Sequence, residues 1–289
     1  MHSFRLGDVE ITQVVEFEGE FAPARVLVPD SSPQLWRDNE SWLAPDHWIP
    51  ETDGYRGAAQ TWLLRSEGKI VLVDTAIGND KNLPHMPLFD HVTTDFLDRL
   101  AEAGAKPEDV DVVVNTHIHF DHVGWNTRLD NGEWAPTFPN ATYLIPSLDN
   151  IRFGPENTHG EQGNQAVYAD SVAPVLDRAV LWEGAHRIDA NLVLAPAPGH
   201  TPGSSLLRLE SGADRAVFVG DLLHSPVQIL RPECNSCFCE DPRQAAATRR
   251  GVLERAADNT ELVVPAHFAG RGAVEVRRDG SNFEITRWA

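Results

Sequence analysis

Three histidines and an aspartate stand within six residues, in the motif His117-x-His119-x-Asp121-His122, directly after the apolar run at 111–115 (DVVVN). A nearly continuous apolar run is typical of a strand buried on both faces of a parallel sheet. The ends of such strands are where α/β proteins place their functional sites. Imidazole and carboxylate groups at this spacing suit a metal ion such as zinc. The motif therefore predicts a metal site at the edge of a sheet.

Three further side chains that can bind a metal occur in the same context, at the C-terminal ends of apolar runs. His200 follows the predicted strand 191–196, Asp221 ends the predicted strand 215–220, and His267 ends the predicted strand 261–264. A single histidine in such a place is more often structural. Three such side chains, each at the end of a predicted strand, instead indicate that they belong to one metal centre together with the first motif.

The hydrophobic pattern of the chain favours an α/β protein with stacked sheets and helices outside them. Besides the runs above, strand patterns occur at 4–17 (a hairpin), 58–78 (two strands joined at Glu67-Gly68), 141–145 and 204–210. Helical spacing occurs at 90–103, 147–154, 164–177 and 241–257, the last opened by Asp241-Pro242.

Residues 22–58 break this regular pattern and are rich in proline, aspartate, serine and tryptophan. A long irregular segment in a compact domain is usually a lid, a binding loop or an arm. We therefore expect residues 22–58 to cover a substrate site, with Trp36, Trp42 and Trp48 touching substrate, or to form a homodimer contact. The alternative is that the three tryptophans only pack the segment onto the core.

The histidine motif, His200, Asp221 and His267 together resemble the ligand set of the metallo-β-lactamase superfamily, over most of residues 59–270. The resemblance implies a four-layer αββα sandwich formed by residues 1–289 as one domain, with two metal ions at the edge between the sheets. Zinc is expected, and other divalent transition metals are alternatives. The resemblance assigns His117, His119 and His200 to the first metal, Asp121, His122 and His267 to the second, and Asp221 to both. Asp74, which matches an early aspartate of the superfamily, would hold a ligand through a hydrogen bond.

This resemblance also implies a hydrolase in which a metal-bridging hydroxide attacks the substrate. The stretch from His119 to Asn126, which includes Phe120, and the stretch 136–141 resemble the branch of N-acyl homoserine lactonases and methyl parathion hydrolase-like esterases. We therefore expect a neutral ester as substrate, a lactone first, and contact between Phe120 and that substrate. The alternatives are an organophosphate or aryl ester, a glyoxalase II-like thioester, and a metal-binding protein without hydrolytic activity.

His224 stands three residues after Asp221, where related lactonases carry a tyrosine that contacts substrate. A neutral histidine can donate the same hydrogen bond or pass a proton to the leaving group. We therefore expect His224 to be catalytic, with Asp121 as the other candidate for proton transfer.

The chain is strongly acidic, with 43 Asp and Glu against 24 Lys and Arg and a net charge of −19. Such a surface repels phosphate backbones, so we expect a small-molecule substrate and no nucleic-acid partner. No apolar run spans a membrane and no signal peptide is visible, which favours a cytoplasmic location. Cys234, Cys237 and Cys239 are expected to be free thiols, because a structural zinc site would need a fourth ligand.

Overall fold

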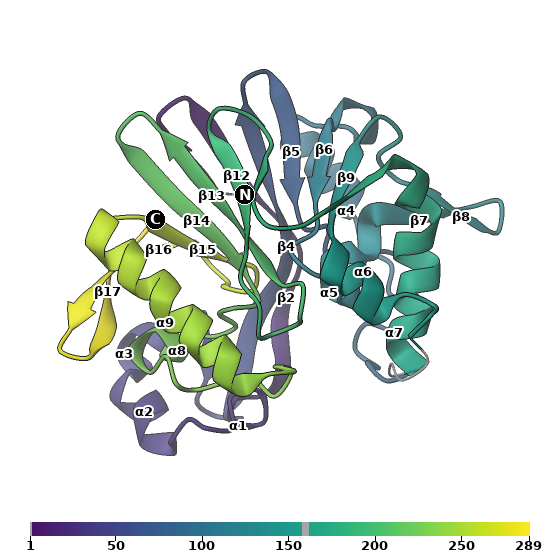
Figure 1. The fold of residues 1–289 in the computed structure, drawn as a ribbon. Helices are drawn as coiled ribbons and strands as arrows, with labels where there is room; N and C mark the ends of the chain where they lie inside the picture. The colour runs from purple at the N-terminus through teal and green to yellow at the C-terminus, as the bar shows by residue number, and fades with distance from the viewer. Residues whose placement is uncertain (1, 158–161) are drawn as a thin grey trace.

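The computed structural model describes residues 2–157 and 162–289, which form two β-sheets packed face to face with helices on the outer faces (Figure 1). All strands of the first sheet precede residue 183, and all strands of the second follow it. The chain therefore passes once from one sheet to the other.

The first sheet has eight strands, in the order β1-β2-β4-β5-β6-β9-β10 with β3 paired to β4. Their bounds are β1 (His2–Leu6), β2 (Val9–Pro23), β3 (Trp48–Ile49), β4 (Gly54–Ser66), β5 (Lys69–Val73), β6 (Val112–Val114), β9 (Thr142–Pro146) and β10 (Ala179–Trp182). Strands β5, β6, β9 and β10 are parallel neighbours, which requires the crossover segments between them.

The second sheet has seven strands in chain order, and only β14 and β15 in it are parallel. Their bounds are β11 (His186–Arg187), β12 (Leu192–Pro196), β13 (Ser205–Ser211), β14 (Asp214–Gly220), β15 (Leu262–Pro265), β16 (Val274–Asp279) and β17 (Asn282–Trp288). A separate hairpin joins β7 (Thr127–Asp130) and β8 (Glu133–Pro136).

The α-helices are α1 (Ala24–Leu27), α2 (Pro33–Asp38), α3 (Glu40–Leu43), α4 (Phe96–Glu102), α5 (Phe120–Val123), α6 (Ser147–Phe153), α7 (Gln162–Val167), α8 (Val227–Leu230) and α9 (Pro242–Asn259). Shorter helical turns are η1 (Pro107–Asp109), η2 (Gly124–Asn126), the π-turn η3 (Tyr168–Val172) and η4 (Ala173–Arg178). Among the described helices, none has both the length and the apolar character needed to cross a bilayer.

Successive side chains of a strand point to opposite faces of its sheet, so each sheet packs against the other sheet on one face and against helices on the other. In β6, Val112 and Val114 face the second sheet, where they join a cluster with Phe218, whereas Val113 faces the outer helices and packs with Phe96. On the other side of the molecule, Leu253 of α9 packs on the outer face of the second sheet. The expected four-layer αββα sandwich is thereby confirmed.

Most predicted elements are present, and the differences have local causes. The helix predicted over 90–103 starts only at Phe96, since His91 adopts a left-handed backbone with φ of 51°. The helix predicted over 164–177 breaks into α7, η3 and η4, with Pro174 near the start of the last turn. Strands β3, β7, β8, β10, β11, β16 and β17 were not predicted.

Residues 22–58 are more regular than predicted. They complete β2, form α1, α2, α3 and β3, and begin β4. Trp36 and Trp48 lie in a buried cluster with Leu43, Tyr55 and Val227, which fastens the segment to the second half of the chain. Packing therefore explains these two tryptophans, and a lid or dimer role for the segment remains a prediction.

Candidate metal centre

The histidine and aspartate side chains singled out in the sequence converge at one end of the two sheets. Each follows a strand: the first motif comes after β6, and the other residues come after β12, β14 and β15. The resulting donor groups are His117, His119, His200 and Asp221 in one set, Asp121, His122 and His267 in a second, and Asp221, His224 and His267 in a third that overlaps both.

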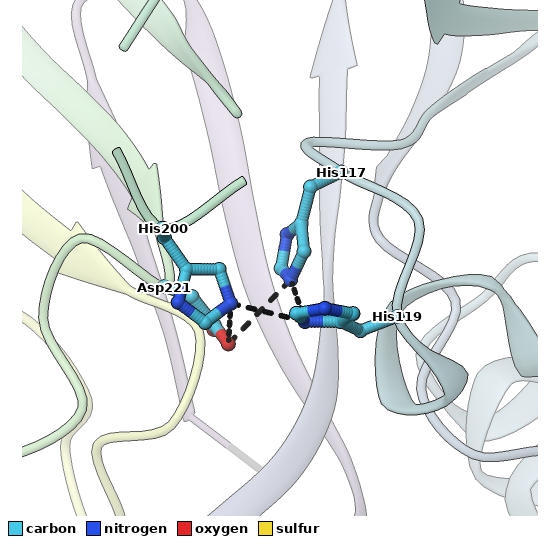
Figure 2. A group of neighbouring side chains, drawn as sticks. All are labelled: His117, His119, His200 and Asp221. Carbon is cyan, nitrogen blue, oxygen red and sulfur yellow. Dashed lines mark hydrogen bonds and ion pairs between the residues drawn. The ribbon is translucent and has the colours of Figure 1, made fainter. Parts of the chain in front are cut away.

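In the first group, three imidazoles meet around one carboxylate oxygen (Figure 2). His119 Nδ1 lies 3.0 Å from both His117 Nε2 and His200 Nε2. Asp221 Oδ2 lies 3.5 Å from His117 Nε2 and 3.2 Å from His200 Nε2. Three nitrogens and one oxygen at these separations surround a point that a single cation can share.

The second group lies on the other side of Asp221. Asp221 Oδ1 is 3.0 Å from His122 Nε2 and 2.8 Å from His267 Nε2, and these two nitrogens are 3.2 Å apart. Asp121 is more peripheral, with its oxygens 3.8 Å from His122 Nε2 and 3.6 Å from His267 Nε2. One carboxylate thus faces both groups, with one oxygen toward each.

Hydrogen bonds on the outer side of two histidines fix how their rings are turned. His122 Nδ1 lies 2.8 Å from Asp74 Oδ2, and His267 Nδ1 lies 2.8 Å from the carbonyl oxygen of Ala58. A proton on each Nδ1 serves these acceptors, so each ring turns its Nε2 toward Asp221. Burial opposes protonation of these two rings, but the charge of Asp221 outweighs it and raises the pKa of both. Imidazole nitrogens that face a buried carboxylate in this way fit a bound cation, which takes the place of the added proton.

Electrostatics agree with this donor set. Burial lowers the pKa of His117 and of His119 well below the usual value, so both rings are neutral ligands. Burial also opposes protonation of His200, but the charge of Asp221 outweighs it and raises the pKa of His200 to about 9. Asp221 therefore attracts positive charge into a buried site, as expected of a metal-binding carboxylate.

Asp74 supports both the motif and the strand that precedes it. Its carboxylate accepts hydrogen bonds from the backbone N–H of Thr116 at 2.7 Å and from the hydroxyl of Thr116 at 2.8 Å, besides facing His122. The hydroxyl of Thr116 is 3.1 Å from His117 Nδ1. Asp74 thus contacts one histidine directly and a second one through Thr116, and its role in orienting metal ligands stays a prediction.

Asp149 is a supporting carboxylate that the sequence analysis missed. It is fully buried and accepts hydrogen bonds from Ile118 N at 3.0 Å, Thr201 Oγ1 at 2.9 Å and Gly203 N at 2.6 Å. These donors belong to the loop of the first motif and to the loop of His200, which lie on different sheets. Asp149 comes soon after the predicted strand 141–145, so the rule that found the ligands could have found it too.

His224 lies beside both groups. Its Nε2 is 3.1 Å from Asp221 Oδ2, and its ring stacks on that of His267. Burial lowers the pKa of His224 to about 4, so the ring is neutral at pH 7. An Nε2–H directed at Asp221 leaves Nδ1 without a partner in the described chain. The backbone oxygen of His224 accepts a hydrogen bond from the hydroxyl of Tyr55 at 2.7 Å, a contact without any signal in the sequence.

Phe238 is a second residue that the sequence analysis missed. Its side chain is 49% exposed, and its ring stacks on His224. The loop that carries it is held by the buried Arg249, which donates to the carbonyl oxygens of Pro232 at 2.6 Å and Cys234 at 2.9 Å. An exposed aromatic ring on a fixed loop beside the donor groups can contact an apolar substrate.

The other predicted substrate residues lie in different surroundings. Phe120 packs against Phe89 and lines a cavity of about 10 Å³. The indole N–H of Trp36 donates to Ser31 Oγ at 2.8 Å, and that of Trp48 donates to Asp53 Oδ1 at 3.1 Å. Trp42 is half-buried and lies near Trp288. Contact of these aromatic side chains with substrate stays a prediction.

The three cysteines are free thiols, as expected. Cys239 is the nearest of them to the donor groups, with Sγ 4.0 Å from His200 Nδ1. Burial raises the pKa of Cys234 to about 11, which keeps this thiol protonated and unreactive at neutral pH.

Comparison with known proteins identifies related chains. A sequence model of the metallo-beta-lactamase superfamily matches residues 54–267. The N-acyl homoserine lactonase of Bacillus cereus is 26% identical over 165 residues, which cover 52% of this chain and 57% of that protein. The chain thus spans little more than half the length of the lactonases that it matches.

Two further similarities extend over more of the chain. The acyl-coenzyme A thioesterase MBLAC2 of Homo sapiens is 26% identical over 257 residues, which cover 82% of each protein. The solved structure of AidC, a dizinc quorum-quenching lactonase in complex with a product, superposes with a TM-score of 0.82 at 21% identity, covering 100% of this chain and 97% of that one. At this identity, the structural likeness supports the fold.

Proposed function

The chain belongs to the metallo-β-lactamase superfamily, and from that premise we propose that it is a metal-dependent hydrolase of neutral esters, with lactones as the preferred class. The observation that carries the proposal is the pair of donor groups that share Asp221. Two donor groups joined by one carboxylate suit two metal ions that act on one bond. Zinc suits a set of imidazole and carboxylate ligands.

We assign each side chain a role in this centre. His117, His119 and His200 would hold one ion, Asp121, His122 and His267 would hold the other, and Asp221 would contact both. When bound, the metals lower the pKa of a shared water and polarise the carbonyl group of the ester.

Asp74 and Asp149 keep the ligand loops in position. Asp74 accepts the Nδ1 proton of His122, and Asp149 joins the two loops of the first group. The donors are therefore oriented before a metal binds. Such preorganisation favours both affinity and rate.

His224 is the residue that we assign to proton handling. It is neutral, lies next to Asp221, and has one nitrogen without a partner among the described residues. The free nitrogen can accept a proton during attack and return it to the leaving alkoxide. Asp121, at the edge of the second group, is the other candidate for this transfer.

Substrate class is argued from charge and from the aromatic side chains near the centre. Phe238 stacks on His224, and Phe153 packs edge-on against His119. These rings favour an apolar acyl group, whereas the net charge of −19 disfavours polyanions. Sequence similarity to N-acyl homoserine lactonases supports a lactone with an acyl chain.

A thioester is the second candidate, because similarity to an acyl-coenzyme A thioesterase extends over 82% of this chain. The phosphates of coenzyme A would have to overcome the repulsion of an acidic surface. We rank it below the lactone for that reason.

A substrate panel tests the proposal. Protein loaded with zinc is assayed with hexanoyl homoserine lactone, phenyl acetate, paraoxon, S-lactoylglutathione and hexanoyl-coenzyme A. We expect about two metals per chain and the highest kcat/KM for the lactone. A higher value for either thioester would reverse the ranking. Metal-replete protein that hydrolyses none of the five would indicate a metal-binding protein.

A further inference from the structure

A buried carboxylate outside the metal centre joins the two segments that carry Asp74 and His122. This carboxylate belongs to Glu16, which is 3% exposed and stands on β2 at an irregularity of the pairing between Val15 and Phe17. An extra residue of this kind forms a β-bulge, which often redirects a side chain beside a functional site. Glu16 therefore does not take part in the regular pairing of β2 with β4.

The first segment, the loop 74–78, follows β5 in an unfavourable backbone conformation. Asp74 and Ala76 adopt left-handed φ angles of 59° and 45°, which residues other than glycine rarely take. Such a conformation persists only when the surrounding structure holds it in place. Glu16 contributes to this hold, because its Oε2 accepts a hydrogen bond of 2.6 Å from the backbone N–H of Ile77.

The second segment, formed by α5 and η2, carries His122 and lies directly against the first. The N–H of Thr75 donates to the carbonyl oxygen of His122, and the N–H of Trp125 donates to that of Thr75, both at 2.8 Å. The approach is so close that a Cβ on Gly124 would lie 1.7 Å from the carbonyl oxygen of Ile77. Movement of either segment must therefore displace the other.

The carboxylate of Glu16 bonds to the second segment as well. Its Oε1 accepts from Trp125 Nε1 at 2.7 Å and from Thr94 Oγ1 at 2.8 Å. Burial raises the pKa of Glu16, and its hydrogen bonds act in the opposite direction. Within the described chain, Glu16 makes no hydrogen bond or ion pair with Asp74 or with a predicted metal ligand. Any effect of Glu16 on the centre must therefore pass through the two segments.

We propose that Glu16 is a positioning residue of the metal centre, which maintains the contact between Asp74 and His122 by holding their two segments together. This rests on the proposed function, because His122 belongs to the second donor group. His122 Nδ1 lies 2.8 Å from Asp74 Oδ2, and a partner of this kind fixes the orientation of a ligating ring. Loss of Glu16 should therefore weaken metal binding at His122 more than at His119, which has no printed-length contact with either segment partner of Glu16.

Zinc binding measured at each donor group separately tests the proposal. Side-chain ¹⁵N resonances of histidine report binding at a ring nitrogen, and His122→Asn and His119→Asn assign the two rings in the metal-free protein. In Glu16→Gln the volume is kept, but an NH₂ group must face at least one N–H donor. With zinc buffered by a chelator, we expect its affinity to fall about 10- to 100-fold at His122 and much less at His119.

Thr94→Val is the matched control, because it removes one donor to the same carboxylate and leaves both segments bonded to it. It should lower the free energy of unfolding and leave zinc affinity unchanged at both rings. Trp125→Phe keeps an aromatic ring but removes the bond between Glu16 and the second segment. It should weaken zinc binding at His122 selectively, and it serves as the test if Glu16→Gln does not fold.

The possible results distinguish this proposal from the proposed function. Equal losses of affinity at the two rings in Glu16→Gln, or an unchanged affinity at His122, would overturn the positioning role and leave Glu16 a purely structural carboxylate. Either result would leave the proposed function standing, since both compare variants of a protein that binds zinc. Failure of the wild-type protein to bind zinc at either ring would refute the centre, and the role of Glu16 with it.

Discussion

Replacing Asp149 should lower both the stability of the fold and the affinity for metal. A second, control variant separates these two effects. The carboxylate accepts three buried hydrogen bonds, from Ile118 N, Thr201 Oγ1 and Gly203 N. In Asp149→Asn the volume is kept, but one oxygen becomes an NH₂ group that must face at least one of these donors. A buried donor left unpaired costs about 1–3 kcal/mol, so we expect Asp149→Asn to lose about that amount of unfolding free energy.

The same variant should weaken the first metal group. Ile118 stands between His117 and His119, and Thr201 follows His200, so loss of the shared acceptor loosens both loops. Replacing a residue that orients metal ligands typically lowers affinity about 10- to 100-fold. Zinc affinity by competition with a chromophoric chelator, and unfolding in urea, measure the two effects.

Asp189→Asn is the matched control for this experiment. Asp189 is also buried and accepts from two backbone N–H groups, those of Asn191 and Leu192, but it contacts neither ligand loop. Because Asp189 Oδ1 accepts both bonds, the amide oxygen of asparagine can keep them, so this variant should lower stability less than Asp149→Asn and leave zinc affinity unchanged. Equal losses of affinity in the two variants would refute the role of Asp149 in joining the ligand loops.

The pH dependence of stability gives an independent check. Burial raises the pKa of Asp149 from 3.8 to about 6, so between these values the folded protein holds a proton that the unfolded chain has released. Below about pH 4 this carboxyl therefore contributes about 3 kcal/mol to the free energy of unfolding. That contribution is lost as the pH rises through 6. The difference in unfolding free energy between wild type and Asp149→Asn should thus widen from pH 6 to pH 4. A constant difference would contradict this assignment.

Three further predictions follow from the centre and its surroundings. Asp221→Ala should lose both metals by elemental analysis, because one carboxylate faces both groups, and retention of one full equivalent would argue against sharing. His224→Ala should keep both metals and lose kcat by about 10²–10⁴-fold, with partial recovery in His224→Tyr; full kcat would make the residue structural. Phe238→Ala should raise KM about tenfold for long-chain lactones only, whereas Trp36→Ala should cost about 3–5 kcal/mol of stability at any chain length. A chain-length effect in Trp36→Ala would instead support the lid.

The sequence was sufficient to predict the donor set because each ligand follows an apolar strand, and strand ends gather at one edge of a sheet. His117 and His267 are 150 positions apart, yet the same local rule identifies both. Asp149 obeys that rule as well, although it supports ligands and binds none itself. The long helix α9 was predicted over 241–257 for an equally local reason, its Asp241-Pro242 start, and in the structure Asp241 does cap the N–H of Gln244.

Other features depend on contacts between distant segments and have no local signal. The exposure of Phe238 results from the anchoring of its loop by Arg249, a buried cation that bonds to the carbonyl groups of Leu222, Pro232 and Cys234 and to Asn235. The tryptophans of residues 22–58 suggested a lid because the segment that carries them has no regular hydrophobic pattern. Only the tertiary structure shows that Trp36 and Trp48 pack against Val227.

The division of the sheets at residue 183 also divides the donors. His117, His119, Asp121 and His122 lie in the first part of the chain, whereas His200, Asp221 and His267 lie in the second. The first two groups each take donors from both parts, so a cation bound in either one would be a removable cross-link between two halves that each form one sheet, whereas the third group, Asp221, His224 and His267, lies in the second part. Two fragments separated near Gly184, where the chain passes between the sheets in a left-handed turn, should therefore reassemble more tightly when a divalent metal is supplied and separate when it is chelated.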